Sequence, residues 1–429
     1  MLTKLKKLSQ SKFVRNVAIV ATGTAGAQAI TMAFSPIITR LYGPEAFGLL
    51  GTFMAILAIA TPIAALTYPI AIVLPKSDCD ALGIAKLSAF LAFIMSGLLA
   101  VIILILGDSL AVLLSIESIA GFLWLIPVAM LFAAFQQILQ QWLIRKKQFK
   151  ITAKVAVMQA LMINSAKVGI GWFNPIGTML IILATVGNAL HALLLWAGLR
   201  KQPAAFVEEQ ENQQAISIKE LAKRHKDFPL FRAPQVAINA LSQGLPVLML
   251  ASFFGPASAG FYTLGKTVVG IPSALIGKSV GDVFYPRITT AAHNKENLFQ
   301  LIFKSTLVLA AIGLIPFAIV IIFGPRLFAF VFGADWIVAG EYARWMALWM
   351  YFGFLNRPSV AAIATLRMQD IFLIYEILSV LMRMGSLYIG FLIFSDDIIA
   401  VMYFSITGVF LNSFLVLYTL INSRYINFV

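Results

Sequence analysis

The sequence predicts an all-α integral membrane protein with about twelve membrane-spanning helices. The chain of 429 residues is 60% hydrophobic and only 12% charged, whereas a soluble domain carries roughly 25% charged residues. Apolar runs recur along the chain with short polar breaks, and most exceed the roughly 20 residues that a crossing helix needs. These runs are uniformly apolar, which excludes the alternating strands of about ten residues that build a membrane β-barrel.

We expect one span in each long apolar run. The runs are 17–40, 47–73, 84–106, 119–143, 152–172, 178–197, 233–254, 260–284, 299–323, 343–366, 371–394 and 398–420.

The distribution of lysine and arginine predicts the orientation. Basic residues gather at the N-terminus and in every second gap, for example Arg145, Lys146 and Lys147, whereas the intervening gaps are nearly bare. Cytoplasmic loops carry this excess, so both termini are expected in the cytoplasm. The net charge of +14 is then a topology signal, and no nucleic-acid partner is expected.

The two halves of the chain resemble each other. Residues 42–48 read Tyr-Gly-Pro-Glu-Ala-Phe-Gly and residues 254–260 read Phe-Gly-Pro-Ala-Ser-Ala-Gly. Each segment follows the first span of its half, and each second span contains proline, then exits at a proline followed by a basic residue (Pro75 and Pro286). Three landmarks in one order indicate a duplication.

The repeat predicts the domain organisation. We expect an N-terminal six-helix lobe at 1–198, a cytoplasmic linker at 199–228 and a C-terminal six-helix lobe at 229–429. Because six is even, both lobes insert the same way up, as a parallel repeat around a central cavity. Within the linker, 216–226 has the pattern of a short amphipathic helix, and a solvated tether is favoured over a partner-binding segment.

Charged residues at membrane depth are the candidate functional groups. Such a residue costs at least about 2.5 kcal/mol at the bilayer centre, so it normally faces a cavity or a partner. The candidate substrate-binding cations are Lys167, Lys266, Lys278, Arg357 and Arg383, and the acids Asp282 and Glu376 are candidates for ion coupling. A surplus of cations suits an anionic substrate, particularly phosphate or pyrophosphate. Alternatively, these cations extend to lipid headgroups or pair across helices.

The remaining motifs and residue types indicate no nucleotide-binding or metal site. Residues 260–267 match the phosphate-binding pattern G-x-x-x-x-G-K-[ST], but that motif needs a preceding strand in an α/β domain, and this segment opens a membrane span. Cys79 is the single cysteine, and the three histidines are far apart. We therefore expect no disulfide, no metal site and no cofactor.

Several segments resemble the polysaccharide biosynthesis (Wzx-like) flippases of the multidrug/oligosaccharidyl-lipid/polysaccharide exporter superfamily. The resemblance is carried by 38–49, 68–76, 245–248, 254–262 and 283–287. It implies a multi-pass protein of the bacterial inner membrane. Such a protein moves undecaprenyl-pyrophosphate-linked oligosaccharide from the cytoplasmic to the periplasmic leaflet by alternating access, for O-antigen (lipopolysaccharide), capsule or exopolysaccharide synthesis. The implied partners are the lipid-linked oligosaccharide, membrane lipids, a polysaccharide polymerase and chain-length proteins.

Two other functions remain open from the residues. A multidrug or small-molecule ion-coupled antiporter would need carboxylates in the lobes, and the first half has almost none at depth. A membrane enzyme would need a large loop rich in acids or histidines, and no loop exceeds the linker. We therefore expect a transporter that catalyses no reaction.

Overall fold

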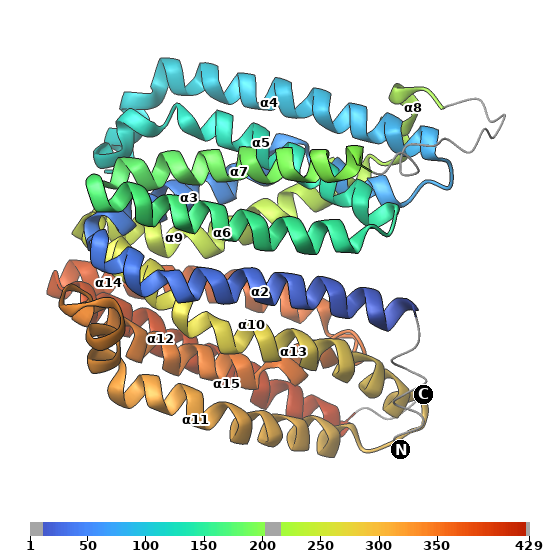
Figure 1. The fold of residues 1–429 in the computed structure, drawn as a ribbon. Coiled ribbons are helices and arrows are strands. Elements are labelled where there is room, and N and C mark those ends of the chain that lie inside the picture. Colours follow the sequence, from blue (N-terminus) through green and yellow to red (C-terminus); the bar gives the residue numbers. More distant parts are fainter. Residues whose placement is uncertain (1–11, 202–215, 426–429) are drawn as a thin grey trace. The chain divides into compact units, whose positions relative to one another are not determined.

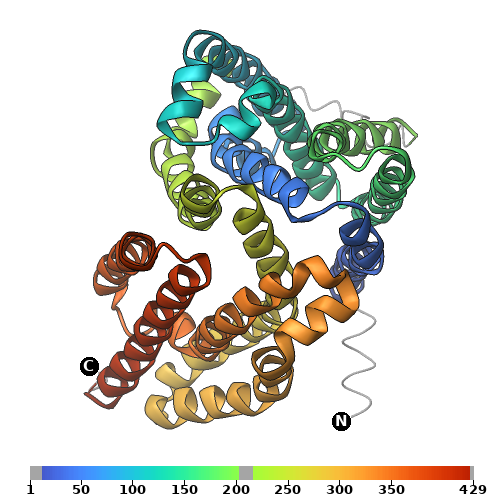
Figure 2. The same ribbon diagram turned by 90° about the vertical axis from the view of Figure 1, so that its left-hand side faces the viewer.

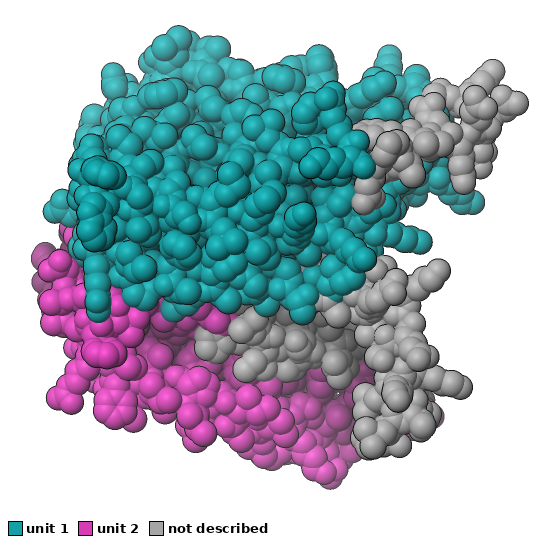
Figure 3. Space-filling model, in the orientation of Figure 1, with its two compact units in different colours: residues 1–248 teal, residues 249–429 magenta. Residues whose placement is uncertain are grey.

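The computed structural model describes residues 12–201 and 216–425, with the side chains of residues 12–18, 20, 272–283, 285, 286, 293 and 425 left out. Within these residues every regular element is helical (Figure 1). The chain divides into two compact units, Met1–Leu248 and Met249–Val429 (Figure 3). In Figure 2 several helices of each unit are seen nearly end-on, as expected for bundles of long helices.

Unit 1 carries the helices of the first half and of the linker. They are α2 (Lys12–Leu41), α3 (Pro44–Ala64), η1 (Tyr68–Val73), α4 (Asp78–Leu113), η2 (Glu117–Phe122), α5 (Leu125–Arg145), α6 (Phe149–Phe173), α7 (Gly177–Arg200), α8 (Ile218–Arg224) and η4 (Phe228–Arg232). Helix α9 (Ala233–Phe254) begins in unit 1 and ends in unit 2.

Unit 2 carries the remaining helices. They are α10 (Pro256–His293), α11 (Leu298–Phe332), η5 (Ala334–Trp336), α12 (Ile337–Leu355), α13 (Arg357–Ala362), α14 (Gln369–Phe394) and α15 (Asp397–Tyr425). A helix covers most of each predicted span, although the span 47–73 is broken after Ala64 and the span 343–366 is divided between α12 and α13. The all-α membrane fold class is confirmed. By length and composition, seven helices of the described chain are apolar enough to cross a membrane: α3, α4, α7, α9 extended to Phe228, α11, α14 and α15. The total of twelve crossings stays a prediction.

The two Gly-Pro turns begin equivalent helices. Pro44 is the first residue of α3 and Pro256 is the first residue of α10, a position where the missing N–H of proline costs nothing. The glycines differ, because Gly255 has φ +92° and Gly43 has φ −69°. Only the second turn therefore requires glycine.

The second helix of the first half differs from the second helix of the second half. In unit 1 the helix ends at Ala64, and Leu66 and Thr67 follow with φ of 48° and 57° before η1 begins. In unit 2 the corresponding helix α10 continues without a break from Pro256 to His293. Left-handed backbone is uncommon at residues other than glycine, so the break marks a strained turn peculiar to the first half.

Helix neighbours recur in the two units. Helix α5 packs on α3, α4 and α7, and its counterpart α12 packs on α10, α11 and α15. Helix α6 packs on α7 as α14 packs on α15. The shared pattern supports the duplication inferred from the Gly-Pro segments.

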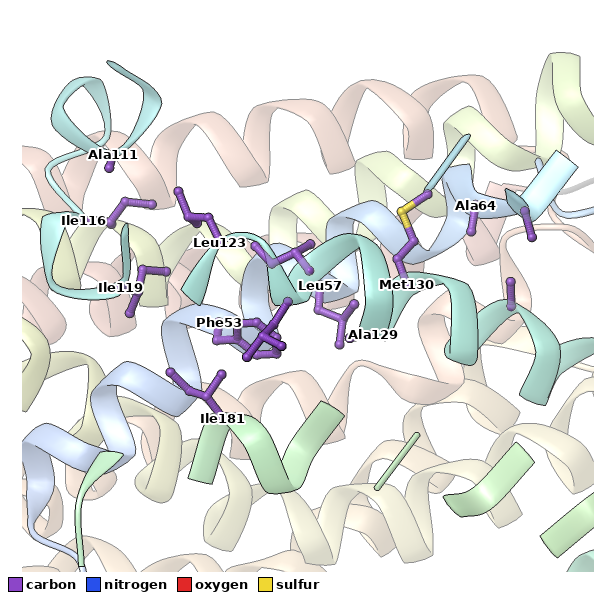
Figure 4. Packing of buried hydrophobic residues seen from close by; sticks show 14 of the residues in the cluster. Phe53, Leu57, Ala64, Ala111, Ile116, Ile119, Leu123, Ala129, Met130 and Ile181 are labelled. Atoms are coloured by element: carbon purple, nitrogen blue, oxygen red, sulfur yellow. The ribbon is translucent and has the colours of Figure 1, made fainter. Parts of the chain in front are cut away.

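Close packing of small and branched side chains builds each core. In unit 1, one cluster of buried hydrophobic residues includes Phe53 and Leu57 of α3, Met130 of α5 and Ile181 of α7 (Figure 4). In unit 2, a Cβ at Gly340 of α12 would come within 2.6 Å of the Gly324 carbonyl oxygen of α11. Lipid is as apolar as these side chains, so close backbone approach, rather than a hydrophobic driving force, holds such helices together.

The end of the linker packs on unit 1. The Leu221 side chain of α8 is buried, and a Cβ at Gly83 of α4 would come within 2.6 Å of it. The Tyr68 hydroxyl donates to the Ala222 carbonyl at 3.0 Å, and the Ile216 N–H donates to Asp80 at 3.1 Å. The amphipathic helix is therefore present. This part is docked rather than a solvated tether, while 202–215 lies outside the described residues.

Candidate functional site

Arg383 is the centre of a group of charged and aromatic side chains in unit 2. Its guanidinium lies 5.3 Å from the centroid of the Trp349 ring and 5.7 Å from that of Phe404. Arg383 also interacts electrostatically with Lys266 and Glu376. We call these five residues, contributed by α10, α12, α14 and α15, the Arg383 cluster.

Aromatic packing holds the rings of the Arg383 cluster in place. Trp349 and Phe404 meet edge to face, with 5.2 Å between ring centroids, and Phe404 meets Tyr262 in the same way at 6.3 Å. On the other side, Gly408 of α15 leaves room for the indole, because any Cβ there would overlap the Trp349 ring. Phe404 and Tyr262 are each only 1% exposed, so the surrounding packing fixes the orientation of the rings beside the guanidinium.

The guanidinium itself is only partly used within the protein. Its Nε donates to the Ser379 carbonyl, one turn earlier in α14, at 3.1 Å. A guanidinium has five N–H donors arranged as a planar fork that matches phosphate or carboxylate oxygens. The described hydrogen bonds therefore leave the terminal N–H groups of the half-buried Arg383 able to bind an anion.

Lys266 reaches the cluster from α10. It follows Gly265, where a Cβ would come within 2.6 Å of the Met346 methyl of α12, so α10 and α12 are in close contact here. The whole segment 260–267, which matched the nucleotide-binding pattern, lies inside the continuous helix α10. Gly265 therefore serves helix packing, and a helix at 260–267 does not form the phosphate-binding loop that the pattern describes.

Other candidate residues lie elsewhere. Arg357 is the first residue of α13 and is exposed, and no described contact joins it to the Arg383 cluster. Lys167 is a half-buried residue of α6 in unit 1, where its backbone carbonyl accepts a hydrogen bond from the buried Tyr42 hydroxyl at 3.0 Å. Lys278 and Asp282 belong to α10, but their side chains lie outside the described residues.

Sequence reasoning from charge alone missed two features of unit 2. The rings of Trp349 and Phe404 were not distinguishable from the many other aromatic residues of the spans. Asp397, at the start of α15, accepts a 2.5 Å hydrogen bond from Ser258 in the first turn of α10. The signal for this pair was the position of Ser258 inside the repeated Gly-Pro segment.

Comparison with known proteins defines the family. A family model described as polysaccharide biosynthesis protein matches residues 37–341, which is most of the chain. The chain belongs to this family. The match includes α10, which contributes Lys266 to the Arg383 cluster, and it ends within the first turns of α12, before Trp349, Glu376, Arg383 and Phe404. No curated protein sequence matches this family member significantly.

Solved structures share the fold of this polysaccharide biosynthesis protein. An inward-facing multidrug resistance MATE family transporter of the MOP superfamily is 16% identical, with a TM-score of 0.68 over 96% of this chain and 98% of that one. The lipid II flippase MurJ in an inward closed conformation is 12% identical, with a TM-score of 0.69 over 94% of this chain and 87% of that one. At such identities the likeness shows the fold alone, which is that of multi-pass membrane transporters.

Proposed function

We propose that this family member is a flippase for a lipid-linked oligosaccharide. The substrate is an oligosaccharide repeat unit joined to undecaprenyl through pyrophosphate. It moves from the cytoplasmic to the periplasmic leaflet of the bacterial inner membrane, where it supplies O-antigen, capsule or exopolysaccharide synthesis. Family membership supports a role in polysaccharide biosynthesis, and the transporter fold supports translocation without a chemical reaction.

The observation that carries the proposal is the composition of the Arg383 cluster. Arg383 is a half-buried cation whose described hydrogen bonds use only its Nε, and Lys266 and Glu376 interact with it electrostatically. A charged residue at membrane depth normally faces a cavity or a partner, and a pyrophosphate would be such a partner for the terminal N–H groups of Arg383. The flat ring of Trp349, which is half-buried, suits the apolar face of a sugar ring beside the anion.

The proposed motion follows from the repeat. Two six-helix lobes around a central cavity expose that cavity alternately to either side by rocking against each other. In this scheme Lys167, Lys278 and Arg357 are further cavity cations, and Asp282 and Glu376 are the groups that couple transport to an ion gradient. Glu376 interacts with Arg383, whereas the side chain of Asp282 lies outside the described residues.

Deletion of the chromosomal copy tests the function. In a strain without a redundant transporter, we expect loss of the surface polysaccharide and accumulation of the lipid-linked repeat unit on the cytoplasmic side. Complementation with the intact protein should restore both. Normal surface polysaccharide in the clean deletion would refute the proposal.

A multidrug antiporter is the second candidate. The structural likeness to the MATE transporter, with a TM-score of 0.68, favours it. It predicts that overexpression lowers the accumulation of cationic drugs in cells, which the flippase proposal does not predict. Unchanged drug accumulation together with the polysaccharide defect described above would eliminate this candidate.

A further inference from the structure

One face of the helix α2 carries a row of polar side chains within the predicted span 17–40. Three of these side chains are exposed and one is half-buried, and successive members are four, three and four residues apart, which places them on one face of the helix. They are Thr24, Gln28, Thr31 and Ser35. At a rise of about 1.5 Å per residue the row extends over about 16 Å. We call these four residues the α2 polar face.

The first half of the α2 polar face has no partner within the described chain. Neither Thr24 nor Gln28 forms a hydrogen bond with another described residue. A neighbouring exposed side of α2 is apolar and suits lipid, with Ala25, Ala29 and Ala33. An amide or a hydroxyl without a hydrogen bond is costly in hydrocarbon. The polar face therefore suits a hydrated space or a ligand rather than lipid.

Helix α6 borders the second half of the α2 polar face. The buried Asn164 of α6 donates from its side-chain amide to the Thr31 hydroxyl at 3.2 Å. Lys167 lies three residues after Asn164, so the two are neighbours on one face of α6. Directly after the end of α2, the Tyr42 hydroxyl donates to the Lys167 carbonyl at 3.0 Å. These two contacts place Asn164 and Lys167 beside the polar face.

Lys167 has no counter-charge on the helices around it. Helix α6 packs on α2, α5 and α7, and none of these four helices contains an aspartate or a glutamate. The Lys167 side chain is half-buried, and none of the described ion pairs includes it. A charged residue at membrane depth normally faces a cavity or a partner. Its ammonium group is therefore able to donate hydrogen bonds to a ligand.

We infer that the α2 polar face, together with Asn164 and Lys167, binds the oligosaccharide part of the substrate, an inference that rests on the proposed function. Hydroxyl and amide side chains both donate and accept hydrogen bonds, as the hydroxyl groups of a sugar do. The oxygens of an ionised pyrophosphate only accept, so they would leave the acceptors of this face unused. A row of neutral groups about 16 Å long matches a chain of sugar units better than a compact anion.

Binding to the purified full-length protein tests the inference with two probes. The first is the lipid-linked repeat unit extracted from host membranes, and the second is undecaprenyl pyrophosphate, which carries no sugar. The variant T24V/Q28L removes two polar groups and breaks no described hydrogen bond. One neutral hydrogen bond is worth about fivefold in affinity. The double variant should therefore bind the repeat unit about 25-fold more weakly, and undecaprenyl pyrophosphate within about twofold of the unmodified protein.

The matched control is T22V, which makes the same substitution as T24V on the opposite face of α2 and should change neither affinity. K167Q should weaken binding of the repeat unit by about tenfold, because it removes a charged donor, and should leave undecaprenyl pyrophosphate binding unchanged. Unchanged affinity for the repeat unit in T24V/Q28L, or an equal loss for both probes, would overturn the inference and leave the proposed function standing. An unmodified protein that does not bind the repeat unit would refute the proposed function, and the inference with it.

Discussion

Replacing Arg383 with lysine separates the geometry of the cluster from its charge. The substitution keeps one positive charge but removes the planar guanidinium that lies over Trp349 and Phe404 and the Nε hydrogen bond to Ser379. Both ring distances fall within the roughly 6 Å range of a cation–π interaction, and each such contact is worth about 0.5–1 kcal/mol. Losing both contacts amounts to about 1–2 kcal/mol, so Arg383→Lys should reduce the rate of transport by roughly 5–30-fold.

Removing the charge itself, as in Arg383→Ala, should reduce transport further, because the proposed contact with the substrate is then lost. A hydrogen bond to a charged group contributes about 1.5–3 kcal/mol, so Arg383→Ala should reduce transport by at least another tenfold relative to Arg383→Lys. The assay is transport of a lipid-linked oligosaccharide across reconstituted liposomes. Expression and thermal unfolding are measured on the same samples.

The control for this prediction is Arg424 of α15. Its guanidinium lies 4.0 Å from the centroid of the Phe299 ring, outside the Arg383 cluster. Arg424→Ala removes a comparable cation–π contact in the same unit and should leave transport unchanged. Transport at the rate of the unmodified protein in Arg383→Ala would show that the cluster is structural.

Three further predictions test other parts of the structure. Lys266→Ala and Arg357→Ala should each lower liposome transport by about tenfold while leaving expression intact, since each removes a proposed substrate cation worth about 1.5 kcal/mol; unchanged rates in both would assign these charges a structural role. Gly255→Ala should lower the free energy of unfolding by about 1–2 kcal/mol because a Cβ is strained at the positive φ of this residue, whereas Gly43→Ala should be nearly neutral. Both positions have open space within 4 Å, so equal effects in thermal unfolding would contradict the backbone explanation. Burial and, secondarily, the neighbouring arginine lower the pKa of His225. Because the pKa is lowered, the docked linker favours the neutral form of His225. The stability of docking is therefore fully present above the ordinary pKa of about 6.5 and is lost as the pH falls through the folded pKa. Protease cleavage of the linker should therefore rise on acidification in the unmodified protein and not in the His225→Gln variant.

The fold class followed from the sequence because membrane spans are a local property. A helix in lipid satisfies its own backbone hydrogen bonds, so a long apolar run specifies a helix without reference to its neighbours. The repeat was equally accessible, since Pro44 and Pro256 begin helices through their own backbone chemistry. For the same local reason the amphipathic pattern of 216–226 marked the helix α8.

The sequence alone did not predict the break after Ala64 or the docking of α8. Two non-glycine residues adopt left-handed backbone at 66 and 67. Thr67 there donates to the carbonyl of Phe228, more than 150 residues away in the chain. Such a turn is tolerated only because distant contacts hold it, and no local pattern reveals those contacts.

By itself, the sequence determined a helical membrane protein with a duplicated half and a surplus of basic residues at depth. Only the tertiary structure decided which of those charges act together. The sequence identified Lys266, Glu376 and Arg383 as separate charged residues. Their association depends on the packing of α10 and α14 around the rings of Trp349 and Phe404. The physical reason is that a buried ionic group is defined by its neighbours across helices, and those neighbours come from side-chain packing rather than from spacing along one helix.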